Sequence, residues 1–251
     1  MSVLTRPVTI GLLLTVAALS RAEDKVVHEQ QKIKTSKESI TIEVFRPKDK
    51  AKHPAVLMLH GADGLSERLK AFQDSAKEIA GKGYVVFLPH YFEATSTKAA
   101  EEKEILEHFL TWMSAIRSCI AHAKSHANVE KDHVGLLGYS LGAYLSLSSA
   151  ATASKQEHKV AAIAEYFGAL PLPFRVGIKQ LPPTLILHGD KDTVVSVEEA
   201  KTLAKLLKQA MIEHQMKIFA GQPHVFRGKA VGEAAKLVTA FFAKHLKNKK
   251  E

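Results

Sequence analysis

The fold of this chain is organised around Val134-Gly135-Leu136-Leu137-Gly138-Tyr139-Ser140-Leu141-Gly142-Ala143. An apolar run ends in Gly-Tyr-Ser-Leu-Gly, and a helical pattern rich in small residues begins directly afterwards. This order predicts a buried strand, a sharp turn that exposes the Ser140 hydroxyl, and a helix. Glycine suits positions 138 and 142, because a Cβ there would clash with a neighbouring strand or helix. We therefore predict a nucleophile elbow at Ser140.

Strands and helices are predicted to alternate on both sides of this turn. Apolar segments without polar alternation are typical of strands that are buried on both faces of a parallel sheet. Such segments cover residues 55–59, 84–88, 134–139, 160–167 and 184–187, and residues 215–219 are predicted to form a short last strand. Helical spacing covers residues 66–80, 98–124, 143–153, 197–210 and 228–246. Upstream, residues 33–46 form one extended region that Pro47 ends.

This alternation predicts an α/β fold, with a doubly wound, mostly parallel sheet and helices on both faces. In such a fold the functional site lies at the carboxyl ends of the strands. The composition agrees with one globular domain, since 46% of the 251 residues are hydrophobic and 24% are charged. We assign that domain to residues 23–251.

The first 22 residues have the pattern of a signal peptide. Arg6 gives a basic start, residues 8–19 are an unbroken run of apolar or small residues, and Ser20-Arg21-Ala22 offers small residues at the two positions that determine cleavage. The run is too short to span a bilayer comfortably, although a retained membrane anchor is the alternative. We expect an exported protein, periplasmic or secreted, without stable membrane insertion after cleavage.

Charge and cysteine content narrow the classes of partner. The formal net charge is +9, and loss of Arg6 and Arg21 with the leader lowers it by two. No nucleic-acid-binding motif accompanies this basicity, so we expect no nucleic-acid partner. Cys119 is the single cysteine, and it falls on the apolar face of a predicted helix, which indicates a core residue. We expect a monomer.

A serine nucleophile needs a base in contact with it and an acid that orients the base. In this architecture the acid and then the histidine follow the serine along the chain. Asp192 follows the strand at 184–187, and His224 follows the last strand in a loop that contains Gly221 and Pro223. Asp190 competes for the acid role, but its tight turn suits it to bonding backbone amides. We favour Ser140, Asp192 and His224 as the triad.

Two backbone amides are needed to hold the oxyanion of the reaction. We expect the Leu141 amide to be one donor and the Ala62 amide, in the loop after the strand at 55–59, to be the other. An ordinary glycine turn is the alternative for that loop. Tyr91 and Phe92 are candidates for substrate contact, or else for core packing. Arg227 is a candidate for attracting a substrate carboxylate, or else for a surface salt bridge.

The chain resembles the α/β-hydrolase superfamily, and within it the dienelactone hydrolase family. The likeness spans roughly residues 35–247 and is carried by Gly138-Tyr139-Ser140-Leu141-Gly142, Tyr166-Phe167-Gly168, His188-Gly189-Asp190-Lys191-Asp192 and His224-Val225-Phe226. It implies triad roles for the serine, aspartate and histidine named above, no cofactor, and hydrolysis of an ester or lactone. Two departures stand out: the family has cysteine where this chain has Ser140, and glutamate where Gly61 stands. They favour a serine esterase over the family's namesake reaction.

Three functional hypotheses follow. The first is a serine hydrolase that cleaves a small carboxylic ester or lactone through an acyl-enzyme, with a small-molecule substrate as its partner. The second is a small peptidase of the same fold, although residues 23–251 show no segment that would gate a peptide substrate. The third is a non-catalytic ligand-binding protein of the hydrolase fold. Binding alone does not require all three triad residue types in order, so we favour the first hypothesis.

Overall fold

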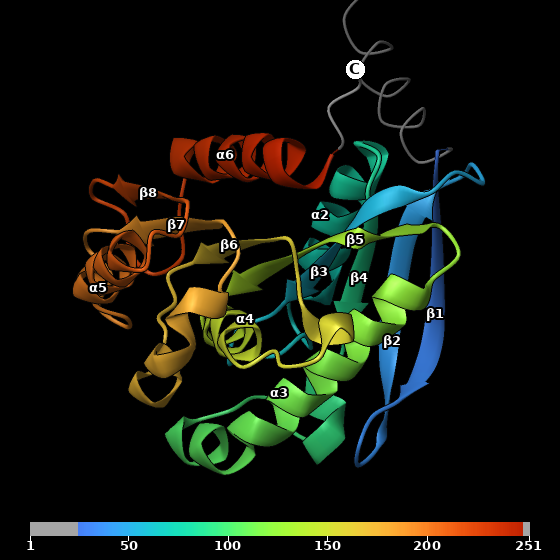
Figure 1. Ribbon diagram of the computed structural model, residues 1–251, viewed down its shortest axis with the longest axis horizontal. Helices are drawn as coiled ribbons and strands as arrows, with labels where there is room; N and C mark the ends of the chain where they lie inside the picture. The colour runs from blue at the N-terminus through green and yellow to red at the C-terminus, as the bar shows by residue number, and fades with distance from the viewer. Residues whose placement is uncertain (1–24, 248–251) are drawn as a thin grey trace, which may run out of the picture.

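An eight-stranded sheet runs through the centre of the molecule in the computed structural model, which describes residues 25–247 (Figure 1). The predicted signal peptide lies outside the described residues. The strand order is β1-β2-β4-β3-β5-β6-β7-β8. The first two strands pair antiparallel, β2 pairs antiparallel with β4, and every other neighbouring pair is parallel. The strands are β1 (Val26–Lys34), β2 (Ser39–Pro47), β3 (His53–Leu59), β4 (Val85–Pro89), β5 (Val129–Tyr139), β6 (Ala162–Tyr166), β7 (Thr184–Gly189) and β8 (His214–Phe219).

The single extended region predicted at residues 33–46 is wrong, because the chain reverses there into a hairpin. Ile33 on β1 pairs with Ile40 on β2, and the Thr35 amide donates to the Glu38 carbonyl at 3.0 Å to close the turn. The polar residues 35–38 interrupt the apolar alternation, and they are the local signal for this turn.

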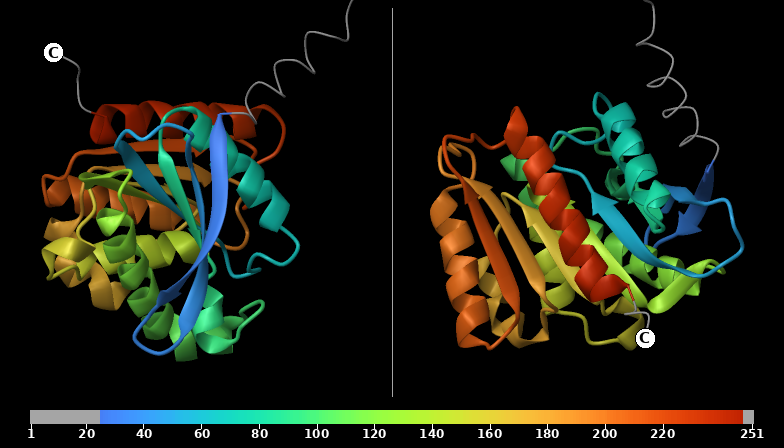
Figure 2. Two further views of the ribbon diagram at one scale, coloured as in Figure 1. Left: turned by 90° about the vertical axis from the view of Figure 1, so that its right-hand side faces the viewer. Right: turned by 90° about the horizontal axis from the view of Figure 1, so that it is seen from above.

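Helices cover both faces of the sheet, as predicted. α2 and α6 both cover one face of the sheet, and α3, α4 and α5 cover the other (Figure 2). The helices are α2 (Leu69–Gly81), α3 (Glu102–Ser125), α4 (Leu141–Ala151), α5 (Val197–Gln209) and α6 (Lys229–Leu246), with short 3₁₀ segments η1 (Tyr91–Thr95), η2 (Gln156–His158) and η3 (Leu172–Gln180). The Ser196 hydroxyl accepts a hydrogen bond from the Glu198 amide and so caps α5. Among the described residues no helix is long and apolar enough to cross a membrane.

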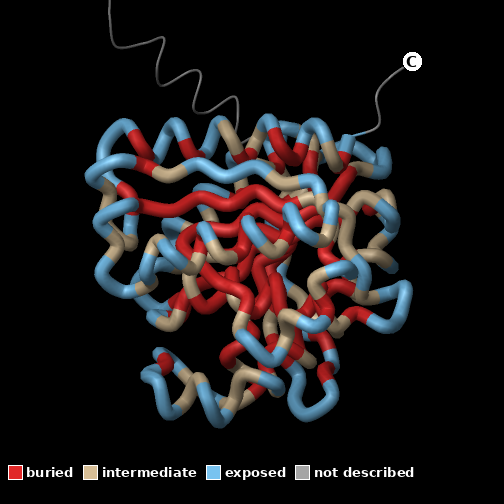
Figure 3. The backbone as a smooth tube through the Cα atoms, turned by 60° about the vertical axis from the view of Figure 1, so that its left-hand side comes forward, coloured by how far each residue is buried: buried red, intermediate tan, exposed pale blue. Residues whose placement is uncertain are grey.

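Burial follows the sheet. The central strands are buried along almost their whole length, whereas the outer faces of the helices are exposed (Figure 3). Cys119 is fully buried on α3, which confirms its place in the core, and this burial raises the pKa of its thiol.

The topology brings two loops together at one edge of the sheet. β3 lies between β4 and β5, so the chain leaves β3 toward one side and later returns to its other side through β5. Loops that follow such neighbouring strands meet at a topological switch point, where open α/β sheets bind ligands. The approach is close here: a Cβ on Gly142 would lie 2.2 Å from the Leu59 carbonyl oxygen, so only glycine fits.

Candidate active site

Ser140 occupies the sharp turn between β5 and α4. Its backbone has φ 51° and ψ −118°. Non-glycine residues rarely adopt these angles, because they strain the backbone, and such strained residues cluster at functional sites. The Ser140 amide donates to the Tyr166 carbonyl at 3.0 Å, and α4 begins at the next residue. The turn is therefore fixed from the neighbouring strand β6, and the hydroxyl is held above the sheet edge.

The structure brings Ser140, His224 and Asp192 into one hydrogen-bonded line. The His224 Nε2 lies 3.0 Å from the Ser140 Oγ, and the His224 Nδ1 lies 2.7 Å from the Asp192 Oδ2. The amides of Val194 and Val195 donate to the Asp192 Oδ1, and these hydrogen bonds, with that from His224, outweigh desolvation and lower the pKa of the carboxyl. An ionised carboxylate only accepts, so the His224 Nδ1 carries the proton and the Nε2 is free to accept the serine proton.

Asp190 has a different task. Its Oδ1 accepts a hydrogen bond from the Gly221 amide at 2.6 Å, so it ties the loop after β7 to the loop that carries His224. This is the backbone-bonding role that the tight turn predicts. Of the two competing carboxylates, only that of Asp192 contacts the histidine.

The loop after β3 lies against Ser140. A Cβ on Gly61 would come within 3.5 Å of the Ser140 Cβ, and Ala62 lines the cavity beside the serine. Within residues 25–247, neither the Ala62 amide nor the Leu141 amide has a hydrogen-bond partner. The Leu141 amide is one of the first N–H groups of α4, which have no acceptor within the helix. Both amides are thus available to an oxygen bound at Ser140.

Tyr91 and Phe92 do not line the cavity beside Ser140, which corrects their prediction as substrate contacts and agrees with the alternative of core packing. Both are buried beneath the loop after β3, where the Tyr91 ring stacks on His60 at 4.0 Å and the Phe92 ring meets it edge-on. The Tyr91 hydroxyl donates to the His60 carbonyl at 2.8 Å. Burial lowers the pKa of His60 to about 4, so this imidazole stays neutral. The two aromatic residues hold the loop that carries Ala62.

Arg227 also lies outside the cavity, which corrects its prediction as a substrate contact. Its side chain is exposed, and its amide donates to the Gln222 side chain at 2.8 Å. The cavity beside Ser140 has a volume of about 620 Å³. Among the residues near the triad that line it are Phe167, Val225 and Phe226.

Sequence reasoning missed two buried polar residues behind the triad. The His188 Nε2 lies 3.2 Å from the Asp192 Oδ2 and donates to the Val195 carbonyl at 2.9 Å. Glu165 is fully buried on the neighbouring strand β6 and accepts a hydrogen bond from the Gly168 amide at 2.7 Å. The His188 Nδ1 and the Glu165 Oε1 are both buried without a partner among the described residues. The i, i+4 spacing of His188 and Asp192 across a strand end is the only sequence signal for this support.

The buried Glu165 carboxyl predicts a pH-dependent stability. Burial raises its pKa from the ordinary 4.5 to about 8. Between these values the folded chain keeps the proton and the unfolded chain has lost it, so the stability falls as pH rises, by up to about 1.4 kcal/mol per pH unit. In Glu165→Gln the side chain at this position cannot ionise, so the decrease in stability with pH that Glu165 causes should disappear. The free energy of unfolding is measured in urea at pH 5 and pH 8. Relative to the native protein, the variant should be more stable at pH 8 than at pH 5 by a few kcal/mol. Parallel stabilities of the two proteins would contradict this.

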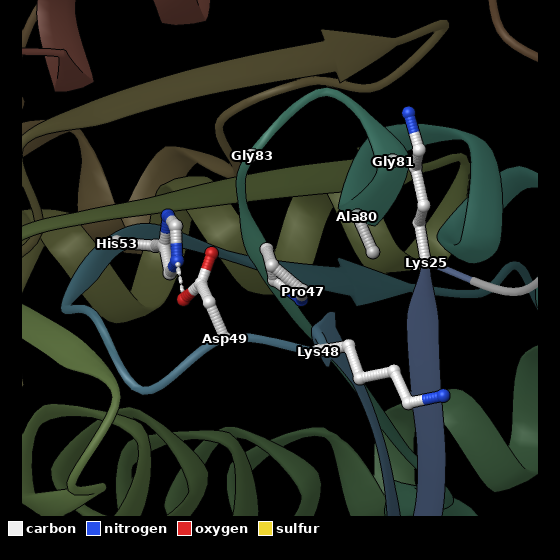
Figure 4. Close-up of a pocket in the computed structure, with 8 residues that line it drawn as sticks. All are labelled: Lys25, Pro47, Lys48, Asp49, His53, Ala80, Gly81 and Gly83. Atoms are coloured by element: carbon white, nitrogen blue, oxygen red, sulfur yellow. Dashed lines mark hydrogen bonds and ion pairs between the residues drawn. The ribbon is translucent and has the colours of Figure 1, made fainter. Parts of the chain in front are cut away.

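A second hollow, of about 460 Å³, lies at the opposite end of the strands (Figure 4). Its two lysines, Lys25 and Lys48, point away from one another, and His53 is already paired with Asp49 at 2.8 Å. Its polar groups do not converge on a common point, so the chemistry of the molecule is concentrated at Ser140.

Comparison with known proteins supports this fold. The sequence profile of the dienelactone hydrolase family matches residues 40–246. A protein of Aquifex aeolicus (strain VF5), assigned as a carboxymethylenebutenolidase, is 24% identical over 233 residues, which cover 86% of this chain and 99% of the relative. A dienelactone hydrolase-like promiscuous phosphotriesterase from metagenomic libraries has a TM-score of 0.76 at 14% identity, over 89% of this chain and 100% of its own. Pyrococcus horikoshii acylaminoacyl peptidase has a TM-score of 0.74 at 15% identity, over 94% of this chain and 44% of its own. The shared architecture is the α/β-hydrolase fold.

Proposed function

The chain belongs to the dienelactone hydrolase family, and from this membership we propose that it is a serine hydrolase of small carboxylic esters or lactones. One observation carries the proposal: Ser140, His224 and Asp192 form a continuous hydrogen-bonded line at a strained strand-to-helix turn. Family membership supports a hydrolase that acts on a small molecule, and the triad supplies the mechanism.

The reaction proceeds in two halves. The Ser140 Oγ attacks the substrate carbonyl carbon while the His224 Nε2 takes its proton, and the amides of Leu141 and Ala62 hold the oxyanion. His224 then returns the proton to the leaving alcohol, and the C–O bond breaks to leave an acyl-enzyme. A water that gives a proton to His224 attacks the acyl carbon, the bond to the Ser140 Oγ breaks as the acid leaves, and His224 returns the proton to that Oγ. Asp192 keeps the imidazole oriented and stabilises it when it is charged.

Two alternative functions are weaker. Some structural neighbours are peptidases, but the likeness to them is at the level of the fold. A protein that only binds a ligand has no need of a strained serine aligned with a histidine and a carboxylate. We further propose that the protein acts after export, in the periplasm or outside the cell, because of the leader pattern at residues 1–22.

Activity against three substrate classes tests the proposal. The purified chain is incubated with 4-nitrophenyl acetate, γ-butyrolactone and an aminoacyl 4-nitroanilide, and separately with a fluorophosphonate probe. We expect turnover of the ester or lactone, little turnover of the anilide, and covalent labelling of Ser140 located by peptide mass spectrometry. Labelling without ester or lactone turnover, but with anilide turnover, would favour the peptidase. Absence of both labelling and turnover would favour the binding protein.

A further inference from the structure

The cavity beside Ser140 extends away from the triad as a groove between α2 and α6. One face of α2 lines it with Ala71, Phe72, Ser75 and Glu78, and the N-cap residue Arg68 extends that row. Val231 and Ala235 of the second helix line the opposite side. Because an α-helix rises 1.5 Å per residue, the ten steps from Arg68 to Glu78 give the groove a length of about 15 Å. Such a length is much more than an acetyl group needs.

The floor of the groove is apolar and aromatic. Met58, Tyr139 and Tyr166 line it from β3, β5 and β6. The rings of Tyr139 and Tyr166 stack at 4.7 Å, and the Phe72 ring meets Tyr139 edge-on at 5.5 Å. Burial raises the pKa of both tyrosines, so the two phenols stay neutral and add no charge to the floor.

Exposed apolar side chains continue this surface around the mouth of the cavity. Val194, Val225 and Val231 all line the cavity and are 70%, 47% and 53% exposed. Isolated exposed apolar residues are ordinary, but these three line the same cavity, and a cavity lined mainly by apolar side chains is typical of a small-molecule site.

The charged groups that line the groove are already paired. Arg68 forms an ion pair with Asp63, and Glu78 pairs with Lys82 at 2.8 Å. Arg68 is the one Lys or Arg among the described residues that line the cavity. A substrate carboxylate in the groove would therefore have to displace Asp63 or stay without a counter-charge, and an uncompensated charge in apolar surroundings is costly.

We propose that the groove between α2 and α6 binds an extended, uncharged, apolar arm of the substrate, so that the preferred substrates are neutral esters with a medium-length aliphatic chain. The inference rests on the proposed function, because the arm matters only when the ester carbonyl sits at Ser140. Transfer of each methylene from water to this surface lowers the free energy of the bound substrate. Short esters and carboxylate-bearing lactones lack this contribution.

A graded series of substrates tests the inference. kcat/KM is measured for the 4-nitrophenyl esters of acetate, butyrate, hexanoate and octanoate, and for mono-4-nitrophenyl adipate against its methyl ester. Since each buried methylene contributes about a fourfold factor at full burial, we expect kcat/KM to rise at least about 30-fold from acetate to octanoate. The free acid of the adipate pair should be at least about tenfold slower than the methyl ester.

Two alanine-to-phenylalanine variants on α6 locate the arm. Ala235→Phe places a ring in the groove and should lower the octanoate-to-acetate ratio of kcat/KM by at least about tenfold. Ala240→Phe makes the same change on an exposed turn of α6 that does not line the cavity, and it should leave both substrates unaffected. Both sites are exposed, so folding is preserved and is checked by circular dichroism.

The outcomes separate this inference from the function on which it rests. Hydrolysis of acetate with a flat chain-length profile, or an Ala235→Phe ratio equal to that of the native protein, overturns the groove assignment and leaves the serine hydrolase intact. A preference for the free adipate acid also overturns it. Failure of every ester together with no fluorophosphonate labelling overturns the proposed function, and the groove assignment falls with it.

Discussion

Ser140→Ala should lower kcat for ester hydrolysis by about 10⁶-fold, the largest effect expected from any single substitution in this chain. Without the Oγ no acyl-enzyme can form, and His224 and Asp192 cannot compensate because the three groups act as one unit. The Ala62 and Leu141 amides, which we propose as the oxyanion donors, stay in place, so a residual rate above that in water should survive. Single-turnover kinetics with 4-nitrophenyl acetate measure both the loss and the residual rate.

Folding must be intact for that result to be meaningful. Alanine keeps the Cβ of serine, so the strained φ of 51° is unchanged and the native fold should persist. The variant should therefore match the native protein in circular dichroism and melt within a few degrees of it. A folded variant that retains more than about 1% of the native kcat would refute the nucleophile assignment, because removal of a triad nucleophile leaves far less.

Asp192→Asn should lower kcat by about 10⁴-fold. An asparagine Oδ1 can still accept the hydrogen bonds from the amides of Val194 and Val195, so the loop keeps its shape. Its amide group, however, donates toward the His224 Nδ1, which then has to accept. The proton moves to the Nε2, and His224 can no longer take the serine proton. Because the substitution changes the tautomer of His224 and leaves the cavity unchanged, kcat should fall while KM stays close to the native value.

Asp190→Asn is the matched control, with the same substitution two residues away. The asparagine Oδ1 at this position can still accept from the Gly221 amide, as Asp190 does at 2.6 Å, and it makes no contact with His224. We expect kcat within about twofold of the native value, because the hydrogen bond to the Gly221 amide is kept and no group in contact with His224 changes; as an exposed substitution it should also change the stability by less than about 0.5 kcal/mol. Equal losses of kcat in the two variants would contradict the assignment of Asp192 as the carboxylate that acts through His224.

The periodicity of apolar residues was enough to predict most helices and strands, because it reflects which side of each segment is buried. The helices predicted at 66–80 and 228–246 are observed as α2 (Leu69–Gly81) and α6 (Lys229–Leu246). The hairpin at β1 and β2 was missed, since β1 (Val26–Lys34) is polar over most of its length and gives no apolar alternation, and only four polar residues separate it from β2. Local patterns identify buried strands well, but a polar edge strand carries little signal in the sequence.

Contacts between residues that are far apart in the sequence were harder to predict. Tyr91 and Phe92 follow a strand end, as substrate-binding residues often do, yet they pack under the loop that carries Ala62. Whether a side chain at a strand end faces solvent or core depends on the neighbouring strand and helix, here β3 and α3. The support of Asp192 by His188 was equally invisible, because it depends on where the loop after β7 folds back.

Local residue types and their spacing were sufficient to predict the α/β alternation, the elbow at Ser140 and the order of serine, acid and histidine. The three-dimensional packing was needed to show that Asp192 and not Asp190 reaches His224, and that an apolar groove leads away from the serine. Ser140 and His224 are 84 residues apart, and Asp192 and His224 are 32 apart. Contacts over such separations depend on the packing of the whole sheet, which no local pattern encodes.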